Sequence, residues 1–386
     1  MDGFQWDIAV QTKSTTAVSL GFVGDVAFNH KVQDVIATHG PNYIFEAAKP
    51  HFEPLDLVVG NLECSIVEDR GATAAVDRPL WTTPVAAAAL RGSGIKVVTL
   101  ANNHMMDCGP EGLRTTMRHL EALGIRYFGA GETLEEAEAP LFMAIKGHRI
   151  AFLGACDASH SFAGPRQPGV AQYAERRLVA RVREARRHCE LVVVVLHADV
   201  EFVRYPAPHR RRLSHRLVEA GAPLVVQHHP HVIQGIECDG SSLIAYSLGN
   251  HVFAFNKNSY QGKHHGTRES LLLSVDVGFC EDRPGFSYET APMVLDDTHR
   301  PVLCDPEMAQ KRNEELERLS ANLSDHRFQR HYWLKTSRSL MWKHVKQSYY
   351  DLRKEGLLAT IKLQFHFVSR AKNWRWIIGF FSAGYR

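Results

Sequence analysis

The chain has 386 residues, of which 45% are apolar and 23% are charged, a globular composition that excludes wholesale disorder. Its formal net charge of +3 hides an asymmetry, because residues 326–386 hold thirteen Lys/Arg against two Asp/Glu while the preceding part carries −8. We therefore expect one large domain over residues 1–325 and a basic, aromatic, helical extension over residues 326–386.

Seven cysteines are present, an odd number, and none forms a C-x-x-C pair. This pattern argues against a disulfide framework and against a structural zinc knot, and it favours a reducing compartment. The first twenty residues lack a basic head followed by a long apolar run, so we expect neither a secretory signal nor a membrane span there. A cytoplasmic location is the resulting expectation.

Short apolar, β-rich runs alternate with amphipathic segments along the chain, which predicts an α/β architecture. The expected strands cover residues 18–23, 55–60, 96–100, 149–154, 191–196, 223–226, 243–246 and 271–277, and the expected helices cover 112–123, 174–188, 207–220 and 306–323. Between residues 241 and 294 the strands follow one another without helices, which indicates a partly antiparallel sheet edge.

Polar residues of a restricted kind follow six of these strands. They are Asp25, Asn61 with Glu63, Asn102-Asn103-His104, His197, His228-His229 with His231, and Asn250-His251. In open α/β sheets the loops beyond the carboxyl ends of strands converge on one crevice. Imidazole, carboxylate and carboxamide groups without thiolates suit a borderline divalent cation, so the pattern predicts a metal site.

Each of these residues also has a simpler interpretation. Asp25 could cap the next helix, Asn103 could serve a turn, and His197 could be a hydrogen-bonded core histidine. The pair His229 and His231, separated by a stiffening proline, places two imidazoles on the same side if the segment is extended. It is the recurrence at successive strand ends that favours a common site.

The ordered motifs resemble those of the CapA-type family of poly-γ-glutamate capsule synthesis, a divergent branch of the calcineurin-like metallophosphatases. The matching motifs are Gly24-Asp25, Gly60-Asn61-Leu62-Glu63, Ala101-Asn102-Asn103-His104 with Asp107 and Gly109, His228-His229-Pro230-His231-Val232, and Tyr246-Ser247-Leu248-Gly249-Asn250. The resemblance implies a four-layer α/β/β/α metallophosphatase-like sandwich with one or two divalent metal ions, Mn, Zn or Fe.

The resemblance also implies roles for individual residues. The implied metal ligands are Asp25, Asn61, Glu63, Asn103, His197, His229 and His231; the implied catalytic residues are His104, Asp25 and His231; and the implied substrate contacts are Asn250, His251 and Arg268. His104 is expected to face the substrate rather than the metal. Ala27 stands where the phosphatases have a histidine ligand, so one metal site is a ligand short or recruits another group.

Three functions remain open at this point. The first is a metal-dependent hydrolase or transferase acting on a peptide-like or anionic polymer, in which the cation activates water and His104 protonates the leaving group. The second is an acid/base epimerase of a peptidyl substrate, in which an Asp/His pair moves a proton. The third is a non-catalytic accessory subunit of capsule polymer synthesis.

Two further segments carry predictions. The polar loop 256–269 is either a plain surface loop or a lid whose Lys263, His264, His265 or Arg268 contacts an anionic substrate. The tail is either a helical cap whose aromatic residues pack on the domain or a membrane-surface contact at the inner face, made through Trp374, Trp376, Phe380 and Phe381. It contains no recognised nucleic-acid motif, so we do not expect it to bind nucleic acid.

Overall fold

The computed structural model describes residues 17–29, 31–69, 76, 79–157, 161–254, 261–279 and 284–355. The chain divides into two compact units, Met1–Ser320 and Ala321–Arg386. Composition predicts a domain boundary after residue 325, and that boundary stays a prediction.

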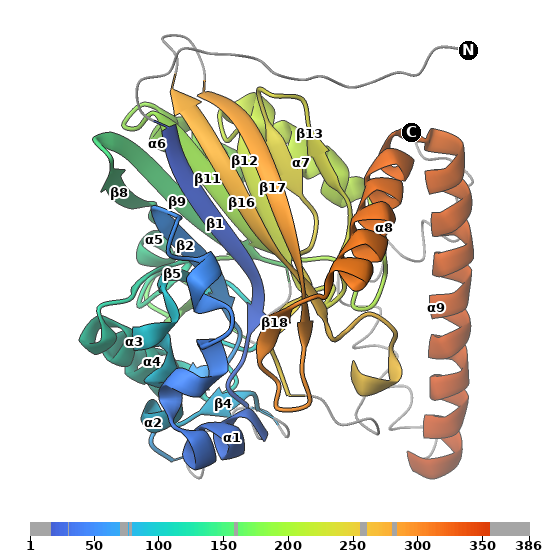
Figure 1. Ribbon diagram of the computed structural model, residues 1–386. Helices are drawn as coiled ribbons and strands as arrows, with labels where there is room; N and C mark the ends of the chain where they lie inside the picture. Colours follow the sequence, from blue (N-terminus) through green and yellow to red (C-terminus); the bar gives the residue numbers. More distant parts are fainter. Residues whose placement is uncertain are drawn as a thin grey trace. The chain divides into compact units, whose positions relative to one another are not determined.

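The first unit contains an eight-stranded mixed sheet (Figure 1). In spatial order its strands are β18 (Pro301–Leu303), β17 (Pro284–Leu295), β16 (Glu269–Phe279), β1 (Ala17–Val26), β2 (Leu57–Leu62), β5 (Ile95–Thr99) and β6 (Arg126–Phe128), with β15 (Asn250–Val252) paired beside the end of β1. The strands β1, β2, β5 and β6 run parallel to one another, whereas β16, β17 and β18 each pair with their neighbours in the antiparallel sense.

A second sheet has six strands. In spatial order they are β13 (Ile236–Cys238), β14 (Leu243–Ala245), β12 (Leu224–His228), β11 (Leu191–His197), β9 (His148–Cys156) and β8 (Leu141–Ile145). Its central strands β9, β11, β12 and β14 are parallel, and β11 is buried along its whole length. The unbroken apolar run of β11 is typical of a parallel strand covered on both faces.

The helices of the first unit connect its strands, and α9 belongs to the second unit. The α-helices are α1 (Lys31–His39), α2 (Pro84–Ala87), α3 (Ala89–Ser93), α4 (Gly109–Leu123), α5 (Leu134–Glu138), α6 (Glu175–Arg186), α7 (Pro208–Ala220), α8 (Pro306–Ser324) and α9 (His326–Glu355), and the 3-10 helices are η1 (Pro41–Phe45), η2 (Lys49–His51) and η3 (Gln261–Lys263). Two short strand pairs complete the unit: β3 (Ser65–Ile66) with β4 (Trp81–Thr82), and β7 (Ala130–Gly131) with β10 (Gly169–Val170). α6 and α7 pack on the second sheet as the crossovers between its parallel strands.

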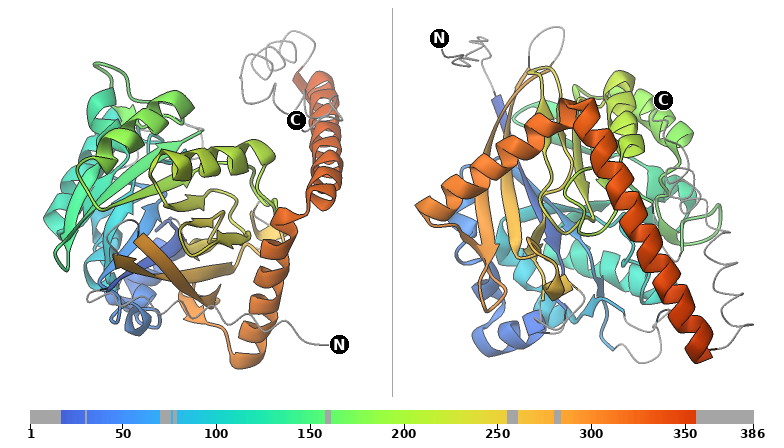
Figure 2. Two further views of the ribbon diagram at one scale, coloured as in Figure 1. Left: turned by 90° about the horizontal axis from the view of Figure 1, so that it is seen from above. Right: turned by 90° about the vertical axis from the view of Figure 1, so that its right-hand side faces the viewer.

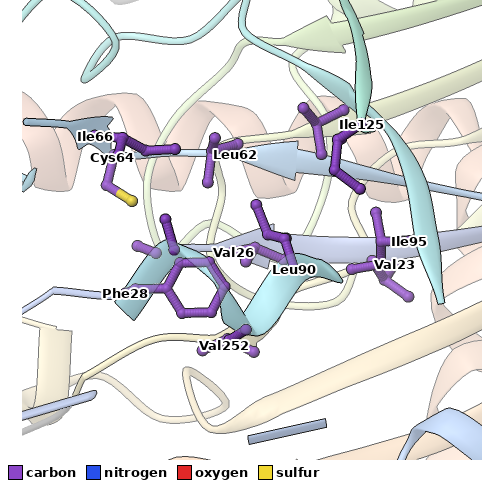
Figure 3. Packing of buried hydrophobic residues seen from close by; sticks show 14 of the residues in the cluster. Val23, Val26, Phe28, Leu62, Cys64, Ile66, Leu90, Ile95, Ile125 and Val252 are labelled. Atoms are coloured by element: carbon purple, nitrogen blue, oxygen red, sulfur yellow. The ribbon is translucent and has the colours of Figure 1, made fainter. Parts of the chain in front are cut away.

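A large apolar core supports the carboxyl ends of β1 and β2. Val26, Phe28 and Leu62 are fully or almost fully buried there and lie close to Leu90 and Val252 (Figure 3). Burying a side chain of this size stabilises the fold by roughly 1.5–3 kcal/mol. The strand ends that carry the polar residues are therefore held by apolar packing.

Two glycines bring β1, β15 and β16 into close backbone contact. A Cβ at Gly24 would lie 2.1 Å from the carbonyl oxygen of Gly249, and a Cβ at Gly249, whose φ is +73°, would lie 2.2 Å from that of Glu269. The backbone N–H of Asp25 donates to the Gly249 carbonyl at 2.9 Å. Only glycine permits this approach, which sets Asp25 beside Asn250.

The mixed α/β prediction is confirmed. The expected helices at 112–123, 174–188 and 207–220 correspond to α4, α6 and α7. The strand-rich stretch 241–294 contains the antiparallel pair β16–β17, and the short helix η3 precedes this pair within the stretch. Residues 256–260 of the expected lid and Trp374, Trp376, Phe380 and Phe381 of the tail lie outside the described residues. Over the described part of the chain, no helix has both the length and the apolar character needed to cross a bilayer.

Candidate metal centre

The carboxyl ends of strands from both sheets meet in one buried cluster. Asp25 and Asn61 face each other in the β1–β2 register, and Glu63 follows directly after β2. From the second sheet, His197 and His228 are paired at the ends of β11 and β12. His229 and His231 follow directly after β12 in the chain.

Five side chains of this cluster could hold a metal ion. They form two groups, Glu63 with His229 and His231, and Asp25 with Glu63 and His197, and within each group the donor atoms lie within 4.8 Å of one another. Glu63 belongs to both groups. Its Oε1 is 3.5 Å from His197 Nε2 and 3.8 Å from His231 Nε2.

The two carboxylate oxygens of Glu63 are buried and have no hydrogen-bond donor among the described residues. Asp25 Oδ2 is also buried and lies 3.3 Å from His231 Nδ1. A buried polar atom without a partner is costly, and a buried carboxylate is more so. Carboxylate oxygens beside imidazole nitrogens are a donor set that Mn, Zn and Fe accept, so the residues fit a divalent cation.

The electrostatics of the metal-free cluster indicate where its protons reside. Burial would raise the pKa of Asp25, but hydrogen bonds to His228 and His231 outweigh burial and hold that pKa well below its usual range. Burial and the charge of Asp25 raise the pKa of Glu63 well above its usual range. The His231 pKa is raised to about 10, because Glu63 and Asp25 outweigh the effect of burial. Protons thus occupy places that a cation would take.

The other two imidazoles of the potential ligand groups are held in the neutral form. Burial, followed by the neighbouring His229, lowers the pKa of His197 well below its usual value. Burial also lowers the pKa of His229. Neutral imidazole is the form that binds a metal, so neither ring must first lose a proton at neutral pH.

Carboxamides orient the cluster. Asn61 Nδ2 donates to Asp25 Oδ1 at 2.8 Å and lies 3.1 Å from His197 Nδ1. Asn61 Oδ1 in turn accepts from Asn102 Nδ2 at 3.0 Å, and Asn103 Oδ1 lies 2.6 Å from His197 Nε2. Asn61 thus lies between Asp25 and His197. The ligand roles expected for Asn61 and Asn103 stay predictions.

His104, like Asn103, is more exposed than the five side chains of the two potential ligand groups. Its side chain is 26% exposed, whereas those of Asp25, Glu63, His197 and His231 are at most 2% exposed. Asp107 Oδ2 fixes His104 Nδ1 at 2.8 Å and also accepts from the backbone N–H of Leu80. His104 Nε2 lies 4.0 Å from Glu63 Oε1. A carboxylate-oriented imidazole at the open side of the cluster has the geometry of a proton donor.

The segment that contains His229 and His231 is not extended, so the predicted reason for bringing these two rings together is wrong. His229 has φ +97° and His231 has φ +56°, so the backbone turns through left-handed conformations. Such conformations are unfavourable for residues with a Cβ and persist where the surroundings enforce them. Here the Pro230 carbonyl accepts from the N–H of Phe202, whose ring stacks on His231 with centroids 6.0 Å apart.

The structure places the three expected substrate contacts differently. Asn250 is buried, with Oδ1 2.9 Å from His231 Nδ1, so it orients that ring. His251 stacks near Phe45 inside the core, its ring nitrogens lack hydrogen-bond partners in the described part of the chain, and burial lowers its pKa to about 3. Arg268 donates to the carbonyl of Leu295 rather than to the cluster. Their contacts with substrate stay predictions.

Two residues of the site, His228 and Asn102, were among the strand-end residues of the sequence but received no individual role. His228 Nδ1 lies 3.1 Å from Asp25 Oδ1 and helps hold that carboxylate ionised. Asn102 accepts from the N–H groups of His104 and Met105, which shapes the turn after β5. His228 ends its strand as His197 does, and that shared position was the available signal.

Comparison with known proteins places this cluster inside a recognised sequence region. The family model described as "Bacterial capsule synthesis protein PGA_cap" matches residues 19–255, which include every residue of the cluster. A "PGA biosynthesis protein CapA" of Bacillus subtilis (strain 168) is 33% identical over 280 residues, covering 69% of this chain and 74% of that protein.

Two further relatives are more distant or shorter in overlap. A "Capsule biosynthesis protein CapA" of Bacillus anthracis is 30% identical over 253 residues, covering 63% of this chain and 62% of that protein. A "Probable polyglutamine synthesis accessory protein" of Mycobacterium tuberculosis is 30% identical over 192 residues, covering 46% of this chain and 49% of that protein. The chain therefore spans less than two thirds of these two relatives.

Proposed function

Because the chain belongs to the bacterial capsule synthesis family PGA_cap, we propose that it is a metal-dependent hydrolase or transferase acting on a peptide-like or anionic polymer. The observation that carries this proposal is Glu63, a fully buried carboxylate that is shared by two potential ligand groups and has no hydrogen-bond donor among the described residues. Such a carboxylate is best explained by a cation.

We assign the cation to Asp25, Glu63, His197, His229 and His231, with Asn61 and Asn103 as the carboxamides at its edge. One or two Mn, Zn or Fe ions would activate a water or polarise a carbonyl or phosphoryl oxygen. His228 and His231 keep the Asp25 carboxylate ionised, and Asn61 Nδ2 and His228 Nδ1 both contact its Oδ1.

His104 is proposed to move the proton. Asp107 holds its Nδ1, which leaves Nε2 free to protonate a leaving group at the open side of the cluster. The Asn103 and His104 side chains are the partly exposed members of the cluster, so a substrate would approach from their side.

Two features support the finer picture of the fold and of the substrate. β1 contacts β12 and β6 contacts β9, while α6 and α7 pack on the second sheet, which supports a four-layer α/β/β/α sandwich around the site. The relatives from the two Bacillus species are named for capsule and PGA biosynthesis, which supports an anionic polymer as the substrate.

A second candidate is an acid/base epimerase of a peptidyl substrate. His231 Nδ1 lies 3.3 Å from Asp25 Oδ2, so the pair can hold and release a proton without a cation. The third candidate, an accessory subunit, is favoured by the Mycobacterium tuberculosis relative, whose name describes an accessory protein.

The decisive test combines metal analysis with product analysis. The purified protein should contain Mn, Zn or Fe, and His229→Ala should lose most of it, whereas His251→Phe, a buried change outside the cluster, should not. Poly-glutamate and peptide substrates should then be cleaved or transferred only by the metal-loaded protein. Deuterium incorporation at an α-carbon without cleavage would select the epimerase, and a protein that can neither hold nor regain metal would overturn the hydrolase.

A further inference from the structure

The outer helices α6 and α7 are unusually rich in arginine. Together they contain nine arginines and three glutamates, a formal charge of +6, although residues 1–325 as a whole carry −8. The two helices contact each other and lie side by side on the second sheet (Figure 2). Arg216 of α7 forms an ion pair with Glu175 of α6, which joins their exposed faces.

Most of these arginines have structural partners. Arg177 and Arg181 bind Glu138, Arg186 binds the Cys189 carbonyl, Arg210 binds Asp157, and Arg211 binds Glu237. Arg176, Arg183 and Arg212 are exposed, and no hydrogen bond or ion pair joins them to another described residue. Arg176 and Arg183 are seven residues apart and so lie on one face of α6, about 10 Å apart along its axis.

The N-terminal ends of both helices border the metal centre. The backbone N–H of Tyr173, just before α6, donates to the carbonyl of Cys156 at the end of β9. Arg210 in the first turn of α7 binds Asp157, whose N–H donates to the carbonyl of His197 at 3.2 Å. The arginine-rich face therefore starts at the sheet edge that holds the candidate ligands.

We propose that Arg176, Arg183 and Arg212 form a track that binds a polycarboxylate chain such as poly-glutamate, with one end of the chain directed to the metal centre. This inference rests on the proposed function for its choice of polymer. Guanidinium groups bind carboxylates in a bidentate manner, and several exposed contacts that are individually weak add up along one chain.

The chemistry of the face favours a polycarboxylate over other polyanions. The exposed positions of α6 and α7 include no Phe, Tyr, Trp or large aliphatic residue. A membrane-surface helix inserts such residues into the bilayer, and single-stranded nucleic acid is held by stacking on aromatic rings. A predominantly cationic surface without such residues lacks both means of binding and suits a flexible chain of carboxylates.

The test is a binding measurement made in the presence of a chelator, so that no metal contributes. Fluorescently labelled poly-glutamate is titrated into the full-length protein, the triple variant Arg176→Glu/Arg183→Glu/Arg212→Glu, and a control, Arg91→Glu/Lys96→Glu/Arg126→Glu. The control changes the net charge equally at exposed positions of α3, β5 and β6. We expect the triple variant to bind about tenfold more weakly or worse, and the control to bind within about twofold of wild type.

Each other outcome overturns the track. Absence of poly-glutamate binding by the wild type removes it, and equal weakening in the control variant shows only an effect of net charge. If the triple variant loses binding to anionic vesicles or single-stranded DNA but keeps poly-glutamate, the partner is a membrane or a nucleic acid. Asp25→Ala should bind the polymer as wild type does while losing metal, so failure of the metal centre and failure of the track are distinguishable.

Discussion

The two sheets contribute different chemistry to the same cluster. The first sheet supplies oxygen donors, namely Asp25, Glu63 and the carboxamides beside them, whereas the second supplies the imidazoles His197, His229 and His231. Among the described residues neither sheet alone presents a potential ligand group, because both groups combine a first-sheet carboxylate with a second-sheet imidazole. A bound cation would therefore join the sheets as well as act on a substrate.

The clearest way to break this division is Glu63→Ala, because Glu63 is the one carboxylate common to both groups. We expect the metal content to fall from stoichiometric to near zero, measured by elemental analysis of the purified protein. Glu269→Gln is the matched control, since Glu269 is also largely buried but is paired with Arg312 at 2.6 Å. Normal metal content in Glu63→Ala would contradict its role as the ligand shared by both groups.

The second prediction separates metal binding from proton transfer. His104→Ala should keep its metal, because His104 is outside both ligand groups, and should lose about 10²- to 10⁴-fold in turnover. Asp25→Ala should lose both metal and turnover. Parallel elemental analysis and activity assays decide this, and equal loss of metal in the two variants would show that His104 is a ligand.

The third prediction concerns pH. The His231 pKa of about 10 means that the metal-free protein holds a proton there throughout the neutral range. Because a metal binds the deprotonated imidazole, affinity should rise with pH below about 10, by up to tenfold per unit for each proton released. Calorimetry in two buffers of different ionisation enthalpy measures that release. Metal binding without proton release would place the proton elsewhere.

The fourth prediction concerns carboxylates that have partners. Arg312 binds Glu269 and Glu315, and Arg204 binds Glu315 at 2.6 Å, which ties α8 to the loop after β11. These ion pairs are partly exposed, so Arg312→Ala should lower the free energy of unfolding by only about 1–2 kcal/mol and leave metal content unchanged. Urea unfolding measures this, with the more exposed Arg318→Ala expected to be near neutral. Loss of metal in Arg312→Ala would link α8 to the site.

The same rule, polar residues at the ends of apolar strands, identified candidate site residues in both sheets. Polar residues at strand ends pointed to Asp25, Glu63, His197, His229 and His231, and the structure brings all five together because the carboxyl ends of parallel strands from both sheets meet there. Their roles as ligands stay predictions. The mixed α/β class followed from the alternation of apolar runs with amphipathic segments.

Other features could not be predicted from local sequence patterns, because they depend on contacts between distant segments. The positive φ of His229 and His231 depends on contacts with the Phe202 segment, which no periodicity records. Arg268 turned out to bind the Leu295 carbonyl, because the strand pairing of β16 with β17 fixes its direction. The ion pairs of α8 join residues that are far apart along the chain, Arg204 with Glu315 and Glu269 with Arg312.

The close approach of Gly24 and Gly249 has a consequence for how mutations will be tolerated. Neither glycine has a side chain to offer a ligand, yet any Cβ at either position must displace a neighbouring carbonyl and so move Asp25 away from Asn250. In a saturation mutagenesis scan, both positions should reject even alanine, as strictly as the ligands reject substitution. These two glycines would thus be intolerant to substitution because a side chain does not fit, although neither can bind a metal. A map of intolerant positions would therefore overstate the number of groups that contact a bound cation.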